Sequence, residues 1–161
     1  CTVDKQLGNY MHVGLIALMM PEAKIIHCLR NPMDTCLSCY FRRFMNADFT
    51  NSLKSLGRYY LAYRRMTDHW DAIAPLPMLS MSYEGLVSTQ EEMTRKLLEF
   101  CELPWQDECL QFHQTKRAVS TSSTWQIRKP IYKTSVKRWE NYALHFEPLR
   151  KLLSEGGVAD L

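Results

Sequence analysis

The chain has 161 residues, of which 46% are hydrophobic and 23% are charged. This length and composition are typical of one globular domain, and they exclude a disordered, collagen-like or coiled-coil protein. No apolar stretch reaches the roughly 18 to 20 residues that a membrane-spanning helix needs, so we expect no membrane association.

The net charge at pH 7 is only +3, but it is unevenly distributed. Residues 109–139 contain seven Lys or Arg and no Asp or Glu, whereas the rest of the chain contains 13 basic and 17 acidic residues. A local excess of cations on an otherwise acidic chain predicts one anion-binding site rather than general affinity for polyanions.

The six cysteines include one closely spaced pair, Cys36 and Cys39. Their C-x-x-C spacing fits a metal or redox site, but no second such pair and no paired histidines accompany it. We therefore expect free thiols that pack as small hydrophobic side chains in a reducing compartment, which indicates a cytoplasmic protein. Because the chain begins at Cys1 and not at Met, we interpret it as a fragment or a processed product.

The first half of the chain predicts helices around one buried strand. Apolar spacing predicts a helix over residues 7–20, and the β-branched run 24–29 predicts a buried strand. Asn31, followed by Pro32 and Asp34, is typical of a helix N-terminus. A long amphipathic helix is predicted from Thr50 to Ala74.

The second half predicts one more strand, over residues 78–83. Two capping-box patterns, at Ser88 and Thr89, predict a helix that ends near Cys101, and a short helix follows over 107–113. Residues 115–134 predict a long ordered loop, and a final helix is expected from Ser135, as its cap, to Glu155. The order of elements indicates an α/β fold, and because two strands make a poor sheet, we expect further strands from a region outside this chain.

One constellation follows the first strand. Arg30 lies where the strand meets the helix N-terminus, and Asp34, Ser38 and Arg42 follow at spacings of four residues on one helical face. A guanidinium fork and a hydroxyl near a helix N-terminus suit a phosphate dianion. The alternative is an Arg30–Asp34 ion pair with Ser38 packed and Arg42 in solvent.

Other segments extend this pattern in a fixed order along nearly the whole chain. They are Asp4-Lys5, Asn9-Tyr10, Gly14-Leu15-Ile16, PEAKIIHCLRNPMDTCLSCYFRRF, Ser82-Tyr83-Glu84-x-Leu86, Leu97 to Trp105, and RKPIYKTSVKRWENY. In this combination the chain resembles the sulfotransferases that use 3'-phosphoadenosine 5'-phosphosulfate (PAPS). The resemblance is to the bacterial branch that is similar to the tyrosylprotein sulfotransferases.

The resemblance implies a P-loop-like α/β fold with a parallel sheet, of which residues 1–161 form a single domain. This domain would be the C-terminal part and would lack the Gly-rich loop that binds the 5'-phosphosulfate. The implied enzyme transfers a sulfuryl group from PAPS to a hydroxyl or amine acceptor and releases 3'-phosphoadenosine 5'-phosphate (PAP). It needs no metal ion, and the acceptor could be a peptide, a saccharide or a small molecule.

Family motifs also imply residue roles. Arg30 and Ser38 match the pair that binds the 3'-phosphate, and further nucleotide contacts match Arg42, Tyr83, Ser123, Lys129 and Arg138. Tyr83 could instead be a buried core aromatic, and Lys129 could be a solvated loop cation.

Lys5 matches the lysine that lies near the oxygen bridging phosphate and sulfate, where it would stabilise charge on the departing phosphate. The proline that usually follows two residues later is replaced by Leu7. No residue matches the family's general base, and among the histidines only His12 is a candidate, with His27, His69, His113 and His145 expected to be structural.

A nucleic-acid-binding module is the alternative function, and it would use the basic loop 116–139. There, Trp125, Tyr132 and Trp139 alternate with Lys and Arg, as base stacking combined with phosphate contacts would require. The acidic remainder of the chain and the absence of known nucleic-acid-binding signatures argue against it.

Overall fold

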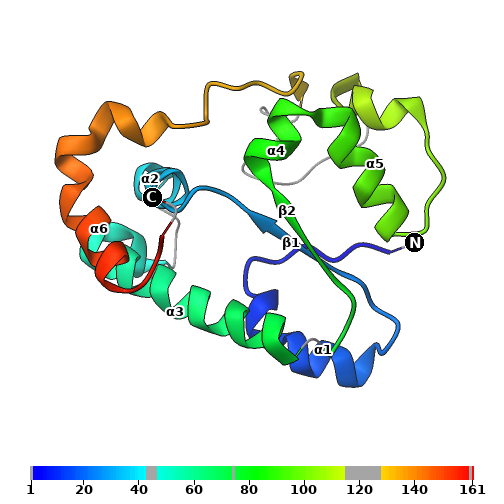
Figure 1. The fold of residues 1–161 in the computed structure, drawn as a ribbon, viewed down its shortest axis with the longest axis horizontal. Coiled ribbons are helices and arrows are strands. Elements are labelled where there is room, and N and C mark those ends of the chain that lie inside the picture. The colour runs from blue at the N-terminus through cyan, green and yellow to red at the C-terminus, as the bar shows by residue number, and fades with distance from the viewer. Residues whose placement is uncertain (1, 43–46, 74, 115–127, 160) are drawn as a thin grey trace.

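The computed structural model describes residues 2–42, 47–73, 75–114, 128–159 and 161. Two central strands lie between two groups of helices (Figure 1). α2 (Pro32–Arg42), α3 (Leu53–Ile73) and α6 (Ala143–Glu155) pack together on one side, and α4 (Tyr83–Ser88) and α5 (Gln90–Phe100) pack together on the other. In the part of the chain described, every helix is too short or too polar to span a lipid bilayer.

The two strands form a parallel pair, which confirms the α/β class. β1 (Ile25–Leu29) and β2 (Met78–Ser82) pair in register from Ile25 opposite Met78 to Leu29 opposite Ser82. Parallel neighbours need a long crossover, and α2, the 3₁₀-helix η2 (Asp48–Asn51) and α3 provide it. Both strands therefore end at the same edge, and Arg30 and Tyr83 follow them there.

The prediction that the first strand is buried was wrong for one of its faces. Ile26 is 39% exposed and Cys28 is also exposed, whereas Ile25, His27 and Leu29 are partly buried. Alternate side chains of a strand point to opposite faces, so within the described residues only one face of β1 is covered.

The predicted start of α2 is confirmed in atomic detail. The Asp34 backbone N–H donates to Oδ1 of Asn31 over 3.1 Å, which is the N-cap bond. The backbone N–H of Asn31 donates to Oε1 of Glu84 over 2.8 Å. The end of β1 is thereby joined to the start of α4, which follows β2.

The hydrophobic core lies where α2, α3 and α6 meet. Met33, Leu37, Leu56, Leu149 and Leu153 are all at most 3% exposed. The helix predicted over Thr50 to Ala74 is α3, preceded by η2, and Ala74 itself lies outside the described residues.

At the N-terminus the predicted helix 7–20 begins later, with the 3₁₀-helix η1 (Asn9–His12) followed by α1 (Val13–Met19). Tyr10 fastens this segment to α3, because its carbonyl accepts from the Trp70 indole over 2.6 Å. Its hydroxyl also donates to the hydroxyl of Tyr59 over 3.1 Å.

The expected capping boxes do not form. Ser82 caps α4 instead, accepting from the Gly85 backbone N–H over 3.1 Å. The hydroxyls of Ser88 and Thr89 both donate back to the Gly85 carbonyl. The helix α4 was therefore not predicted from the sequence. The next helix, α5, starts at Gln90 without a side-chain cap.

The C-terminal helix also starts later than predicted. Ser135 lies in a turn and does not cap it; the 3₁₀-helix η5 (Arg138–Tyr142) comes first, and α6 follows. The predicted short helix is the 3₁₀-helix η3 (Asp107–Gln114). Of the predicted loop 115–134, residues 129–134 are irregular as expected, and 115–127 lie outside the described residues.

Candidate anion-binding site

A cavity of about 330 Å³ lies at the edge of the sheet where both strands end. Arg30 and Tyr83 line it from the ends of β1 and β2, α2 contributes Asp34, Leu37, Ser38, Phe41 and Arg42, and Tyr132, Ser135 and Arg138 complete the wall. The carboxyl ends of parallel strands are where open α/β sheets bind their ligands. Topology and cavity therefore indicate the same place.

Arg30 is the centre of this site. Its Nη2 donates to the Ser135 carbonyl oxygen over 2.6 Å, and its Cζ lies 4.9 Å from the centroid of the Tyr83 ring. Its Nε is buried and has no hydrogen-bond partner among the described residues. A buried donor without an acceptor is costly, and an oxygen of a bound anion would satisfy it.

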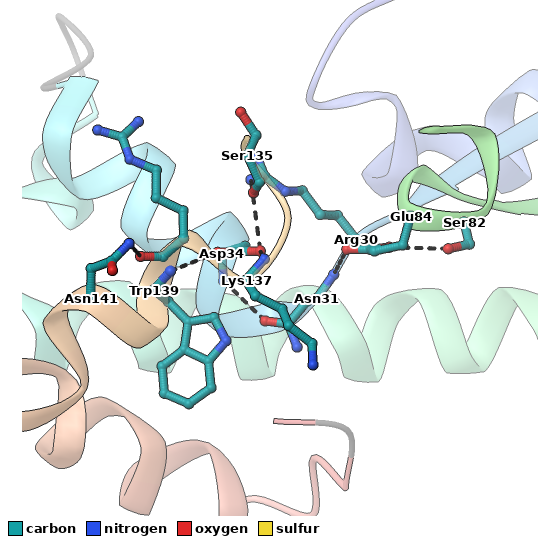
Figure 2. Close-up of polar contacts among 10 residues, drawn as sticks. Arg30, Asn31, Asp34, Ser82, Glu84, Ser135, Lys137, Trp139 and Asn141 are labelled. Atoms are coloured by element: carbon teal, nitrogen blue, oxygen red, sulfur yellow. Dashed lines mark hydrogen bonds and ion pairs between the residues drawn. The ribbon is translucent and has the colours of Figure 1, made fainter. Parts of the chain in front are cut away.

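Asp34 and Arg30 form the ion pair that the sequence allowed, but only a long one. The nearest approach, from Arg30 Nη2 to Asp34 Oδ2, is 4.0 Å. The Asp34 carboxylate, which is 1% exposed, instead accepts backbone N–H bonds from Lys137 over 2.7 Å and from Trp139 over 2.9 Å (Figure 2). Arg30 thus remains able to serve an anionic ligand.

The wall of the cavity has an excess of positive charge. Arg30, Arg42 and Arg138 oppose the single carboxylate of Asp34 among the lining residues. Ser38 adds a hydroxyl, and the Arg138 guanidinium carbon lies 5.8 Å from the Phe41 ring centroid. Guanidinium and hydroxyl donors beside aromatic rings can bind an anion that has a planar, apolar part.

Of the seven residues expected to contact a nucleotide, the structure brings five together around this cavity: Arg30, Ser38, Arg42, Tyr83 and Arg138. Tyr83 is half-buried under Arg30 and is not part of the hydrophobic core cluster. Lys129 is exposed and is not among the lining residues, and Ser123 lies outside the described residues.

Lys5, the expected catalytic residue, lies in the exposed segment before η1 and does not line the cavity. The side chain of Asn9, from the same motif, donates to Oδ2 of Asp4 over 2.8 Å. Neither His12 nor His27 is among the residues that line the cavity. His12 is exposed, and His27 forms a hydrogen bond with the Tyr63 hydroxyl.

Several features of the site were not predicted from the sequence. Phe41 lies three residues after Ser38 on the same helix face, so helical spacing could have identified it. The sequence indicates Tyr132 only as a possible stacking residue for nucleic acid, and no local signal assigns it to this wall. The contacts between Asp34 and the C-terminal segment join residues more than 100 positions apart, and no sequence signal indicates them.

A second hollow of similar volume lies beside α4. It is lined by Glu84, Gly85, Val87, Ser88, Lys133 and Val136. Glu84 is the only carboxylate among the described residues that line it, and it already accepts hydrogen bonds from Asn31 and Ser82. The lining residues that the structure describes include one cation, Lys133, and no arginine, so this hollow is a poorer anion site. Among the described residues, no three His, Cys, Asp or Glu side chains are grouped so that they could hold a metal ion.

Comparison with known proteins gives concordant results. The model of the sulfotransferase family matches residues 1–107. An uncharacterised protein of Aquifex aeolicus (strain VF5) is 40% identical over 158 residues, which are 96% of this chain and 21% of that protein. Protein-tyrosine sulfotransferase A of Caenorhabditis elegans is 25% identical over 128 residues, 75% of this chain and 34% of that protein.

The chain therefore spans about a fifth and about a third of the lengths of these two relatives. The matched family region contains β1, α2 and β2, and with them Arg30, Ser38, Arg42 and Tyr83. Because the sulfotransferase family model matches more than half of the chain, the chain belongs to the sulfotransferase family.

Proposed function

We propose that the cavity binds PAPS as sulfuryl donor, with the 3'-phosphate between Arg30 and Ser38. The single observation that carries this proposal is the buried, unpartnered Nε of Arg30 in a cavity that two further arginines and a serine also line. The 3'-phosphate would accept from this Nε and from the Ser38 hydroxyl.

Charge supports this assignment. The donor nucleotide brings about four negative charges, which need several cations within Coulombic reach. Arg42 and Arg138 line the same cavity as Arg30, and Phe41 and Tyr132 offer aromatic surface to the nucleoside. A P-loop-like arrangement, with the nucleotide at the carboxyl ends of parallel strands, is the fold that we propose around this site.

The proposed reaction moves a sulfuryl group in line from PAPS to an acceptor hydroxyl or amine. The bond between sulfur and the bridging oxygen breaks, and that oxygen stays on the 5'-phosphate of the departing PAP. The acceptor proton passes to a base. Positioning and electrostatic stabilisation supply most of the catalysis in such transfers, because the donor is already activated. We assign Lys5 to the bridging oxygen on the basis of its motif alone.

Calorimetric titration with PAP tests the donor site. We expect the unaltered chain to bind PAP, and Arg30→Ala to weaken binding by about 10- to 100-fold because a charged hydrogen bond is lost. Arg95→Ala is the matched control, since Arg95 lies on the exposed face of α5 and pairs with Glu91. Absence of PAP binding, or equal affinity of the two variants, would contradict the proposal.

A further inference from the structure

The carboxylate of Asp34 joins α2 to the segment that contains Arg138 (Figure 2). Its two oxygens accept separate backbone bonds: Oδ2 from Lys137 and Oδ1 from Trp139. Arg138 is the residue between these two donors. The backbone on either side of Arg138 is thereby fixed to the same helix that provides Ser38.

A third contact fixes the same segment just upstream. Arg30 Nη2 donates to the Ser135 carbonyl oxygen over 2.6 Å, and the same Nη2 lies 4.0 Å from Asp34 Oδ2. Two residues close to the end of β1 thus hold residues 135, 137 and 139. Hydrogen bonds thus hold the backbone at every second residue from 135 to 139. Arg138, which lies between the last two of these residues, lines the cavity.

The backbone of this segment needs such support. Lys137 has φ 58° and ψ 22°, a left-handed conformation that residues other than Gly rarely adopt. Conformations of this kind persist where surrounding contacts determine them, and they are frequent at ligand sites. Lys137, the residue in this conformation, is also the one whose backbone N–H donates to Asp34.

We propose that Asp34 is a positioning residue that holds Arg138 at the anion cavity; this inference rests on the proposed function of that cavity. Asp34 acts on the ligand through the backbone around Arg138. Its side chain is fully buried, and both oxygens already accept N–H donors. When an amide replaces the carboxylate, as in Asp34→Asn, one of the two backbone N–H groups faces an NH2 that cannot accept. The segment is then held less tightly and the Arg138 side chain is no longer fixed at the cavity, whereas Ser38 stays on α2.

A double-mutant cycle for PAP affinity tests this role. We expect Asp34→Asn to weaken PAP binding by about 10-fold in the unaltered background but by less than about 2-fold in an Arg138→Ala background. In an Arg42→Ala background the full loss should remain, because Arg42 lies on α2 itself. Asp68→Asn, at an exposed ion pair of α3, is the matched control and should leave affinity unchanged.

Amide hydrogen exchange provides a readout that needs no ligand. In the unaltered protein the amides of Lys137 and Trp139 should be protected, since each donates to a buried carboxylate. In Asp34→Asn they should exchange faster while amides of α3 keep their protection. If Asp34→Asn does not fold, as judged by circular dichroism, the exchange of the unaltered protein still decides: unprotected amides at 137 and 139 overturn the proposal.

The outcomes separate the two proposals. If the unaltered protein does not bind PAP, the proposed function fails, and the positioning role fails with it even where exchange shows the segment to be fixed. If PAP binds but the Asp34→Asn loss persists in the Arg138→Ala background, Asp34 acts through Arg30 or through general stability, and only the positioning role is overturned.

Discussion

The backbone N–H of Trp139 donates a 2.9 Å hydrogen bond to Oδ1 of Asp34, across 105 positions of the chain. This bond places the start of η5 beside the start of α2. The end of the segment 109–139, which contains no Asp or Glu, therefore reaches the end of β1. Trp139 itself packs against the hydrophobic core cluster. A segment that is remote in sequence thereby completes a site that begins at Arg30.

Ser38→Ala should weaken PAP binding with little effect on folding. Ser38 is exposed on α2 in the cavity wall, and a hydrogen bond from a hydroxyl to a charged phosphate contributes about 1.5 to 3 kcal/mol, which corresponds to roughly 10- to 100-fold in affinity. Calorimetric titration and a thermal melt measure the two effects. Ser154→Ala, an exposed serine of α6, should change neither, and an unchanged affinity in Ser38→Ala would remove Ser38 from the site.

Gly57→Ala should destabilise the protein although alanine favours helices. A Cβ at Gly57 would lie 2.6 Å from Leu152 Cδ2 and 2.9 Å from Leu149 Cδ1, where α3 meets α6. Overpacking of this kind costs about 1 to 3 kcal/mol, which exceeds the gain in helix propensity of up to about 1 kcal/mol.

Gly85→Ala is the control for this substitution. A Cβ at Gly85, in α4, meets no atom closer than 3.6 Å, so the helix-propensity gain should remain. Urea unfolding of both variants gives the comparison. A Gly57→Ala variant as stable as Gly85→Ala would show that α6 can move away from α3 without cost.

Cys36 and Cys28 should differ sharply in reactivity. Burial raises the pKa of the Cys36 thiol to about 12, whereas Cys28 is exposed on β1. Only the thiolate reacts with alkylating agents, so iodoacetamide at pH 8 should label Cys28 and leave Cys36 unmodified in the folded protein. Peptide mass spectrometry measures the labelling, with the urea-unfolded chain as control; rapid labelling of Cys36 in the folded chain would contradict its burial.

His27 should make the protein less stable as the pH falls. Burial lowers the pKa of this imidazole below its usual value, and the nearby carboxylate of Asp71 opposes the shift only in part. Between the lowered pKa of the folded state and the usual pKa near 6.5, the unfolded chain binds the proton more readily, so stability is full above this window and decreases as pH falls through it.

Thermal melts at pH 7.5 and pH 5.5 test the role of His27. The unaltered protein should lose more stability between these values than His27→Gln, in which the amide can still bond to the Tyr63 hydroxyl. Equal losses in the two proteins would show that other groups determine the acid sensitivity.

Local signals in the sequence predict the fold around Arg30 well. The apolar run of β1 and the Asn31-Pro32-x-Asp34 start of α2 depend on neighbouring residues, and the structure confirms both. α4 escaped prediction because six residues are too few to show helical periodicity. The hydroxyls of Ser88 and Thr89 also fit a capping box that does not form.

The site itself could be predicted only in part. Arg30, Ser38 and Arg42 lie on one strand end and one helix, so their spacing is enough to group them. Arg138 was expected from motif order, but its place in the cavity depends on the bonds of Asp34 and Arg30 to a distant segment. Such long-range contacts depend on how the helices pack, which no local pattern determines.

The most direct test of the donor site compares PAP with adenosine 5'-monophosphate, which lacks only the 3'-phosphate. Calorimetric titration should give PAP an affinity at least about 30-fold higher, in line with two charged hydrogen bonds to the 3'-phosphate, and Arg30→Ala should abolish most of this difference. Equal affinities for the two nucleotides, or a difference that persists in Arg30→Ala, would contradict a 3'-phosphate site at Arg30 and Ser38.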